Sequence, residues 1–247
     1  MDAQQSSQEI STSSTGLTKD QAQRLGSEGF IILPGVLSEE DCDFFSHTID
    51  EIWRTNRLGE IYRWETGVQF VPNLLQYSTI FERFVTQPLV LAAVREVLGP
   101  DFQLSLVNGR RVDPGAGNQP LHDLERRRGL PFVKCNAIWC LDEFTALNGP
   151  TRVLPGSHLT NEPFLSRIED PLLPHPDEQL ALAPRGSVVF HNSQLIHGGS
   201  ENTADAPRRS VHSAFCLWTE PTRDDWSCLP SEIQSQLTPE AKKLLGL

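Results

Sequence analysis

The stretch GSVVFHNSQLIHGG, residues 186–199, carries the pattern that decides the expected fold. It is short, rich in apolar and β-branched residues, and bounded by glycines, which is typical of a β-strand that ends in a turn. A second run of this kind, RRSVHSAFCLWTE at 208–220, follows after a polar connection. The length of that connection predicts that the two runs return as antiparallel neighbours.

Similar runs extend upstream through the second half of the chain. Gly, Pro and Asn punctuate them, as they punctuate the turns of all-β proteins. These runs are FQLSLVNGRRV (102–112), PFVKCNAIWCLDEF (131–144) and TRVLPGSH (151–158). Several short strands with such turns predict a β-sandwich of the jelly-roll kind, in which residues distant in sequence meet at one open end.

The first hundred residues have a helical character instead. Thr18 begins one expected helix, and Ser38 caps a longer one that has acids in its first turn and bases in its last. Residues 79–99 predict two short helices broken near Pro88, and a last helix is expected at 238–246. The fold class is therefore α+β, with an N-terminal helical layer supporting the jelly roll.

The amino-acid composition limits how many domains the chain can form and which partners it can bind. The 247 residues are 38% hydrophobic, which fits one large domain at 17–247 preceded by a polar, disordered tail at 1–16. The formal net charge of -11 disfavours nucleic acid and anionic membranes as partners. Because five cysteines lack a pairing pattern and no apolar run is long enough to span a bilayer, we expect a cytoplasmic protein. The oligomeric state is left open.

Two histidines and one arginine suggest the chemistry. His197 stands before two glycines, and Arg208 begins the next expected strand, so both side chains can face one cavity. His122 lies in the loop-like stretch GNQPLHDLERRRG (117–129), close to acidic residues. Non-haem Fe(II) oxygenases use two His and one carboxylate as ligands. A 2-oxo acid that chelates such a metal needs a cationic clamp at its far carboxylate, a bond that suits arginine.

Three stretches resemble the phytanoyl-CoA dioxygenase family. They are GFIILPGVLSEEDC (29–42), NAIWCLDEFTALNGPTRVLPGSH (136–158) and GSVVFHNSQLIHGGSENTADAPRRSVHSAF (186–215). The resemblance covers roughly residues 18–220. It implies a double-stranded β-helix, also called a jelly-roll or cupin-like core, and the use of Fe(II), 2-oxoglutarate and O2.

The resemblance also assigns residues. It implies that His197 is the distal iron ligand and that Arg208 is the clamp for the 2-oxoglutarate tail, with Arg209 as the near alternative. Polar contacts to 2-oxoglutarate are implied for the three residues Gln119, Asn136 and Thr151. His158, within NGPTRVLPGSH, is expected to be structural.

The first ligand pair departs from the family pattern. In members of the family this pair has the form His-x-Asp. In this chain the stretch QPLHDLE has Asp123 directly after His122, and Leu124 stands at the position of the acid. We favour Asp123 as the carboxylate, reached by a turned backbone. Glu125, a halide or water in place of the acid, and altered metal binding stay open.

The expected function is dioxygenase chemistry on a small, natural-product-like molecule, by hydroxylation, desaturation or ring-forming oxidation. A non-catalytic or metal-altered β-sandwich relative, and a halogenase-like variant without the protein carboxylate, are the alternatives. A cupin-like metalloenzyme without a cosubstrate leaves Arg208 unexplained. For the substrate, residues 60–78 are expected to form a lid carrying the aromatic residues Tyr62, Trp64 and Phe70, and the aromatic residues Trp139, Phe190, Phe215 and Trp218 belong to the core or the site.

Overall fold

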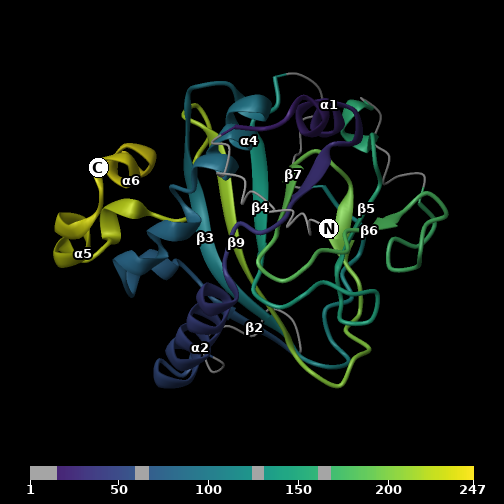
Figure 1. Cartoon of the computed structure of the whole chain (residues 1–247), viewed down its shortest axis with the longest axis horizontal. Helices are drawn as coiled ribbons and strands as arrows, with labels where there is room; N and C mark the ends of the chain where they lie inside the picture. The colour runs from purple at the N-terminus through teal and green to yellow at the C-terminus, as the bar shows by residue number, and fades with distance from the viewer. Residues whose placement is uncertain (1–15, 59–66, 124–130, 161–167) are drawn as a thin grey trace, which may run out of the picture.

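The computed structural model describes residues 16–58, 67–123, 131–160 and 168–247 (Figure 1). Its strands form a six-stranded sheet of order β1-β7-β4-β9-β3-β2 and a three-stranded sheet of order β6-β5-β8. All neighbouring strands in the two sheets pair antiparallel. The strands are β1 Phe30–Leu33, β2 Val68–Val71, β3 Phe102–Val112, β4 Lys134–Cys140, β5 Thr151–Val153, β6 Gln179–Leu180, β7 Val188–Asn192, β8 His197–Gly199 and β9 Arg208–Leu217.

Helices occupy the N-terminal part, as the sequence predicts. The helices and 3-10 turns of the described residues are α1 Lys19–Glu28, α2 Glu39–Thr55, η1 Leu74–Gln76, η2 Thr79–Phe84, α4 Pro88–Leu98, η3 Ser157–Leu159, η5 Trp226–Cys228, α5 Ser231–Gln236 and α6 Pro239–Leu245. The combination of helices and antiparallel sheets confirms the α+β class. Of the two short helices expected over 79–99, the first is a 3-10 helix and the second is α4.

Local sequence explains where the first two helices begin. Thr18 and Gln21 form a capping box at α1, and Ser38 and Asp41 form one at α2. Each box satisfies two N–H groups that a helix start would otherwise leave without partners. Gly29 ends α1 with a φ of 84°, a conformation that glycine adopts at little cost.

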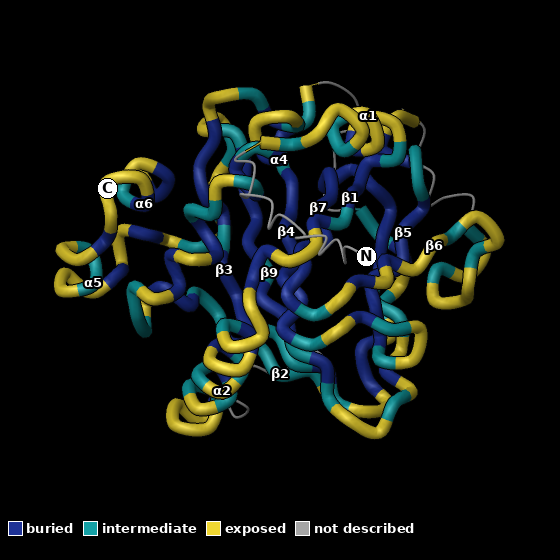
Figure 2. The backbone as a smooth tube through the Cα atoms, in the orientation of Figure 1, coloured by how far each residue is buried: buried dark blue, intermediate teal, exposed yellow. Residues whose placement is uncertain are grey.

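Helices α1, α2, α4 and α6 contribute to the apolar cluster on the outer face of the six-stranded sheet, and the central strands of that sheet are largely buried (Figure 2). Phe45 of α2 lies in the same core cluster as Trp139 of β4 and Phe215 of β9. The ring of Phe84 meets that of Trp139 edge-on, with centroids 5.1 Å apart. These contacts fix the large sheet from behind, so its other face is left to form a cavity.

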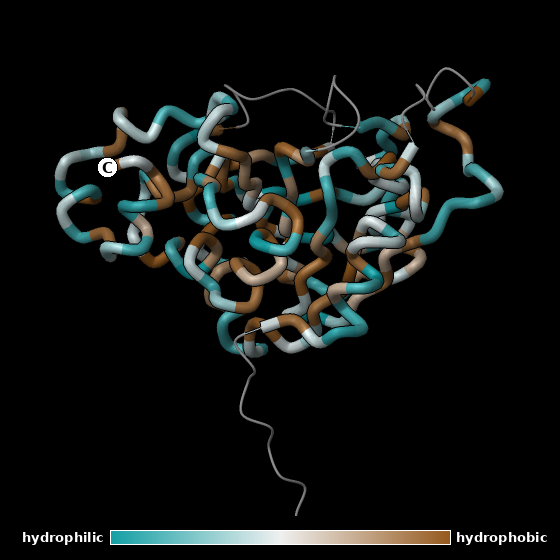
Figure 3. The backbone as a smooth tube through the Cα atoms, turned by 90° about the horizontal axis from the view of Figure 1, so that it is seen from above, coloured by the Kyte–Doolittle hydropathy of each residue, from teal (hydrophilic) through white to brown (hydrophobic). Residues whose placement is uncertain are grey.

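Successive strand residues point to opposite faces of a sheet, and this places the cavity. On β4, Trp139 packs into the helix-covered core while its neighbour Ile138 lines the cavity. On β9, Phe215 and Ala214 divide in the same way. Figure 3 shows the apolar segments gathered in the middle of the molecule, with hydrophilic segments towards the outside.

The remaining expectations have mixed outcomes. All five cysteines are free, and four of them are buried. Within the described ranges, every helix is too short or too polar to cross a membrane. Of the expected lid, residues 67–78 are described: they contain the edge strand β2, paired with β3, and η1. Tyr62 and Trp64 lie outside the described residues, as does most of the expected tail.

Candidate active site

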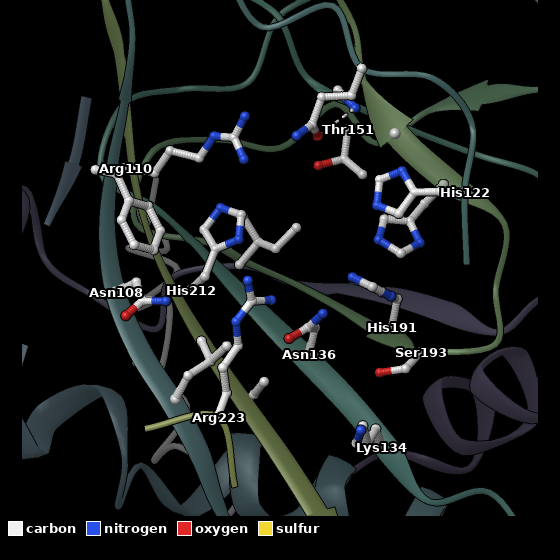
Figure 4. Close-up of a pocket in the computed structure, with 18 of the residues that line it drawn as sticks. Asn108, Arg110, His122, Lys134, Asn136, Thr151, His191, Ser193, His212 and Arg223 are labelled. Carbon is white, nitrogen blue, oxygen red and sulfur yellow. Dashed lines mark hydrogen bonds between the residues drawn. The ribbon is translucent and has the colours of Figure 1, made fainter. Parts of the chain in front are cut away.

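A cavity of about 660 Å³ opens on the inner face of the large sheet and is also lined by residues of the small one (Figure 4). Strands β2, β3, β4, β7 and β9 of the large sheet contribute side chains, and so do β5 and β8 of the small sheet. Six residues predicted from the sequence line this cavity: Gln119, His122, Asn136, Thr151, His197 and Arg208. The fold therefore brings together residues that are up to 89 positions apart in the sequence, as Gln119 and Arg208 are.

His122 and His197 are held together by their backbones. Each donates its backbone N–H to the carbonyl oxygen of the other, and both N–O distances are 2.8 Å. The centroids of the two imidazole rings lie 4.5 Å apart. This exchange forms an isolated antiparallel bridge, so the loop that carries His122 is tied directly to β8.

The tautomer of both rings follows from their contacts. His122 Nδ1 lies 2.8 Å from the carbonyl oxygen of Pro120, and His197 Nδ1 lies 2.7 Å from that of Leu195. Because a carbonyl only accepts, each Nδ1 carries the proton when the ring is neutral. The Nε2 lone pair of each ring is then the one that can coordinate a metal, an arrangement common among metal-binding histidines.

Electrostatics keep His197 neutral. Burial, and after it the neighbouring His191 and His122, lower the pKa of His197 well below its ordinary value. A metal competes with a proton for the same lone pair, so a neutral imidazole is ready to coordinate near neutral pH.

Gly198 and Gly199 let the His122 segment approach β8. A Cβ on Gly199 would lie 2.5 Å from the carbonyl oxygen of Gly117, and one on Gly198 would lie 3.0 Å from that of Gln119. In the structure their smallness serves backbone packing that holds the two histidines in register.

The carboxylate of the expected metal site is not in the cavity lining. Asp123 is described and is absent from that lining, while Leu124 and Glu125 lie outside the described residues. Within the part of the chain that the structure describes, no three His, Cys, Asp and Glu side chains are grouped so as to hold a metal ion. The described residues thus bring together the two imidazoles of the expected metal site, those of His122 and His197.

Arg208 points into the cavity at the start of β9. Its Nη1 donates to Ser210 Oγ at 3.0 Å and its Nη2 to the Gly149 carbonyl at 2.9 Å. Its guanidinium also stacks 4.4 Å from the centroid of the Phe144 ring. The group is therefore positioned by three separate contacts, which lowers the entropic cost of gripping an anion.

Arg209 faces the other side of the sheet. Its Nε donates to Asp50 Oδ2 at 3.0 Å and its Nη1 to Asp142 Oδ2 at 3.4 Å. Of the two arginines that the sequence left open, Arg208 alone lines the cavity. Strand alternation is the physical reason, since adjacent residues on a strand point to opposite faces.

Sequence reasoning gave His191 and His212 no role, yet both line the cavity. The His191 ring lies 4.3 Å from that of His197, and burial lowers the pKa of His191 to about 4. Its Nδ1 contacts the Asn192 carbonyl at 3.0 Å, whereas its buried Nε2 has no hydrogen-bond partner among the described residues. The alternation of VVFHN was the available signal, because it puts His191 on the face opposite Phe190.

Other sequence candidates have structural roles. His158 is buried, and its Nε2 lies 3.1 Å from the Gly26 carbonyl, which joins the signature turn to α1. The aromatic residues Trp139, Phe190 and Phe215 are fully buried in the core, and Trp218 is largely exposed. Of the aromatic residues in the described part of the expected lid, Phe70 lines the cavity.

A comparison with protein families identifies the chain. The model of the phytanoyl-CoA dioxygenase (PhyH) family matches residues 26–210. The chain belongs to this family. The family's enzymes depend on Fe(II) and 2-oxoglutarate and use O2, so the expected family, enzyme class and cofactor class are confirmed.

Relatives of this family member are themselves named dioxygenases. Dioxygenase trt7 from Aspergillus terreus is 28% identical over 244 residues, covering 92% of this chain and 83% of trt7. Dioxygenase FrzG from a Cladobotryum species is 29% identical over 229 residues, covering 81% of this chain and 68% of FrzG.

Solved structures share the jelly-roll core, which confirms the expected fold. HygX from Streptomyces hygroscopicus, with nickel and 2-oxoglutarate bound, superposes with a TM-score of 0.68 at 21% identity, covering 84% of this chain and 90% of HygX. SnoK, a carbocyclase from nogalamycin biosynthesis, has a TM-score of 0.65 at 18% identity, covering 81% of this chain and 84% of SnoK.

Proposed function

We propose that this dioxygenase oxidises a small, natural-product-like molecule, using Fe(II) held by His122 and His197 and 2-oxoglutarate held by Arg208. The observation that carries the proposal is the reciprocal backbone pairing of His122 with His197 in the same cavity as Arg208. Both imidazoles present Nε2, and the guanidinium supplies the charge that a dicarboxylate requires.

The donor set fits 2-oxoglutarate well. Arg208 would take the far carboxylate, while the three polar side chains at the positions predicted from the sequence, Gln119, Asn136 and Thr151, line the same cavity. Gln119 Oε1 already accepts the backbone N–H of Gly199 at 3.2 Å, so its amide nitrogen is directed to other acceptors. When bound, Fe(II) with 2-oxoglutarate and O2 supplies the oxidising chemistry.

The protein's own residues bind, orient and exclude water. Both Nδ1–H groups are tied to carbonyl oxygens, which fixes the planes of the two coordinating rings. The buried apolar wall behind Ile138 limits solvent on that side. Hydroxylation, desaturation and ring-forming oxidation are each compatible with this cavity, because the outcome depends on which substrate bond lies nearest the metal.

We retain Asp123 as the third protein ligand in this proposal. Two neutral imidazoles on Fe(II) favour one hard anionic oxygen, and Asp123 is the nearest carboxylate in sequence. Its reach requires a turn of the backbone at 122–123. The second candidate, a site without a protein carboxylate that admits a halide, is favoured by the lack of Asp and Glu among the described residues of the cavity lining.

Anaerobic titration tests the proposal. Fe(II) and 2-oxoglutarate, added together without O2, are expected to give the weak visible charge-transfer band of a chelated 2-oxo acid, and each alone is expected to give none. Adding chloride in place of another anion separates the two candidates, because only the second has a halide on the metal. If no band forms at saturating 2-oxoglutarate, the proposed use of this cavity is wrong.

A further inference from the structure

The histidines of the cavity differ in what their Nε2 atoms contact. In the proposed function, His122 and His197 use Nε2 to hold the metal, and His212 Nε2 lies 3.2 Å from Ser210 Oγ. His191 also lines the cavity and is fully buried. Its Nε2 has no hydrogen-bond partner among the described residues.

The strand and the ring contact of His191 fix the direction of this atom. β7 is paired on both sides, so that His191 lies opposite Phe30 of β1 and Asn136 of β4. Its Nδ1 lies 3.0 Å from the carbonyl oxygen of Asn192, which only accepts, so Nδ1 carries the proton of the neutral ring. Burial lowers the pKa of the ring to about 4. Near neutral pH, Nε2 is therefore a hydrogen-bond acceptor.

The lone pair of this Nε2 is not used by the metal site. The ring of His191 lies 4.3 Å from that of His197. Within the described ranges, however, no three His, Cys, Asp and Glu side chains are grouped so as to hold a metal ion. We therefore place His191 beside the proposed metal and not among its ligands.

A second polar side chain lies just beyond the end of β7. Ser193 lines the cavity, and its buried Oγ also lacks a hydrogen-bond partner in the part of the chain that the structure describes. Its backbone N–H donates to the carbonyl oxygen of Lys134 at 3.2 Å, which extends the pairing with β4 by one residue. Figure 4 shows His191, Ser193 and Asn136 on the same side of the pocket.

A buried acceptor without a donor destabilises the fold, because it has given up its hydrogen bond to water. An apolar residue at position 191 would avoid this cost. The preceding residues Val188, Val189 and Phe190 show that β7 readily buries apolar side chains. The polar atom of His191 is explained if a ligand in the cavity supplies the donor.

The ligands of the proposed function differ in what they can offer His191. 2-Oxoglutarate is a dianion near neutral pH, with acceptor oxygens and neither O–H nor N–H, and O2 carries no hydrogen. Neither can donate to Nε2. The remaining ligand is the substrate, and a cavity of about 660 Å³ has room for a small molecule beside the cosubstrate.

We propose that the substrate carries a hydroxyl or N–H group that donates a hydrogen bond to His191 Nε2, and that His191 selects for substrates with this donor. The selection acts close to the reacting bond, since the ring of His191 neighbours that of the metal ligand His197. Naming the donor's carrier as the substrate rests on the proposed function. The acceptor itself stands on the geometry of β7 and the cavity.

Two matched pairs of probes test the selection. Naphthol and indole each carry a donor, whereas methylnaphthalene and indene have nearly the same shapes without one. Dissociation constants are measured on the full chain, loaded with Ni(II) and saturated with 2-oxoglutarate. We expect naphthol, indole or both to bind about tenfold or more tightly than the donor-free partner. The pair with the larger ratio shows whether the site prefers a hydroxyl or an N–H group.

Variants of His191 locate the acceptor. His191→Leu should abolish the preference for the donor, and His191→Gln, whose amide oxygen accepts, should restore part of it. Both variants should bind Ni(II) and 2-oxoglutarate as the parent chain does, a readout that a damaged metal site would change. His47→Leu, at an exposed position of α2, is the control and should keep the full preference.

Nitrogen NMR of the parent chain gives a readout that does not depend on the folding of any variant. The chain is labelled at its histidines and loaded with Zn(II) in place of Ni(II). Addition of naphthol or indole should shift the signal of the unprotonated Nε2 of His191, as expected for an acceptor that gains a hydrogen bond. An unchanged signal at saturating probe overturns the proposal.

Affinity ratios near one in both pairs overturn the proposal, as does a preference that persists in His191→Leu. If Ser193→Ala alone removes the preference, the acceptor is Ser193 and the role given to His191 is wrong. If Ni(II) or 2-oxoglutarate does not bind the parent chain, the proposed function fails. The effect of His191→Leu on the probes, measured without metal, then still decides whether His191 recognises the donor.

Discussion

His122 and His197 exchange both of their backbone hydrogen bonds, each at 2.8 Å, although they are 75 positions apart in sequence. The exchange joins the loop after β3 to β8 at the point where the two imidazoles meet. The carbonyl contacts fix the planes of both rings, and the two backbones hold each other in place. The pair is therefore preorganised, so that binding a metal would cost little for the ordering of these two side chains.

Replacement of one imidazole should abolish iron binding. His197→Ala is expected to reduce the iron content from near one to near zero per chain, because one strong nitrogen ligand is too few to retain Fe(II). Metal analysis after anaerobic loading measures this content. His47→Ala, at an exposed position of α2, is the control and should keep full iron. Full occupancy in His197→Ala would refute the assignment.

Substitutions of the adjacent residues Arg208 and Arg209 test which arginine binds the cosubstrate 2-oxoglutarate. Arg208→Ala should raise the dissociation constant of 2-oxoglutarate by roughly 30-fold or more, since losing a buried charge pair costs about 2–5 kcal/mol. Arg209→Ala removes contacts to Asp50 and Asp142 on the outer face and should leave that constant nearly unchanged. Calorimetry with Ni(II)-loaded protein measures both. A reversed pattern would show that the clamp is Arg209.

Three variants show which residue, if any, supplies the carboxylate ligand of the metal. If Asp123 coordinates the metal, Asp123→Ala alone should collapse iron content and succinate formation, and Glu125→Ala should be nearly silent. If the protein supplies no carboxylate, both changes should be nearly silent and Leu124→Asp should strengthen iron binding. A large effect of Glu125→Ala alone assigns the ligand to that residue.

Replacing the buried carboxyl group of Asp224 should stabilise the fold, by an amount that depends on pH. Burial raises its pKa from 3.8 to about 6, opposed by the backbone N–H of Val107 and by Arg223. The folded pKa exceeds the unfolded one, so the unfavourable contribution is absent at low pH and grows as pH rises from about 4 to 6. Asp224→Asn should therefore raise the free energy of unfolding at neutral pH by about 1–3 kcal/mol.

Denaturant titrations at several pH values measure that gain, which should shrink as the pH is lowered toward about 4. Asp205→Asn, at an exposed loop position, is the control and should change little at any pH. A constant difference between Asp224→Asn and the parent chain across this range would mean that the titration of Asp224 is not its cause.

Local patterns predicted most of the fold. Alternating apolar runs identified β7 and β9, and the polar residues Thr18 and Ser38 identified the helix starts, because these signals depend on neighbours in sequence. The 3-10 form of η2 was missed, since the few residues before Pro88 fit either kind of turn.

The sequence predicted those site residues that belong to a recognisable motif. It did not predict the residues that the pairing of strands brings to the cavity. His197 and Arg208 stand in recognisable stretches, and both line the cavity. Arg110 and Arg223 also line the cavity, and the sequence did not predict this, because their positions depend on the register of β3 and on the fold of the segment after β9. No local pattern encodes that register.

The pairing of β3 with β9 controls the placement of two pairs of adjacent arginines, Arg110–Arg111 on β3 and Arg208–Arg209 on β9: Arg110 and Arg208 line the cavity, whereas Arg111 and Arg209 contact Asp50 on the other face. If β3 and β9 paired one residue out of register, the two arginines of one pair would exchange faces of the sheet. Arg111 or Arg209 would then lose its contact with Asp50 and turn to the cavity side, while its neighbour would leave that side. The same slip would turn the buried apolar side chains of one strand away from the helix-covered core, so their burial favours the observed alignment. The alignment of the two strands therefore decides which arginine of each pair reaches the cavity and which one contacts Asp50, whether or not a ligand is bound.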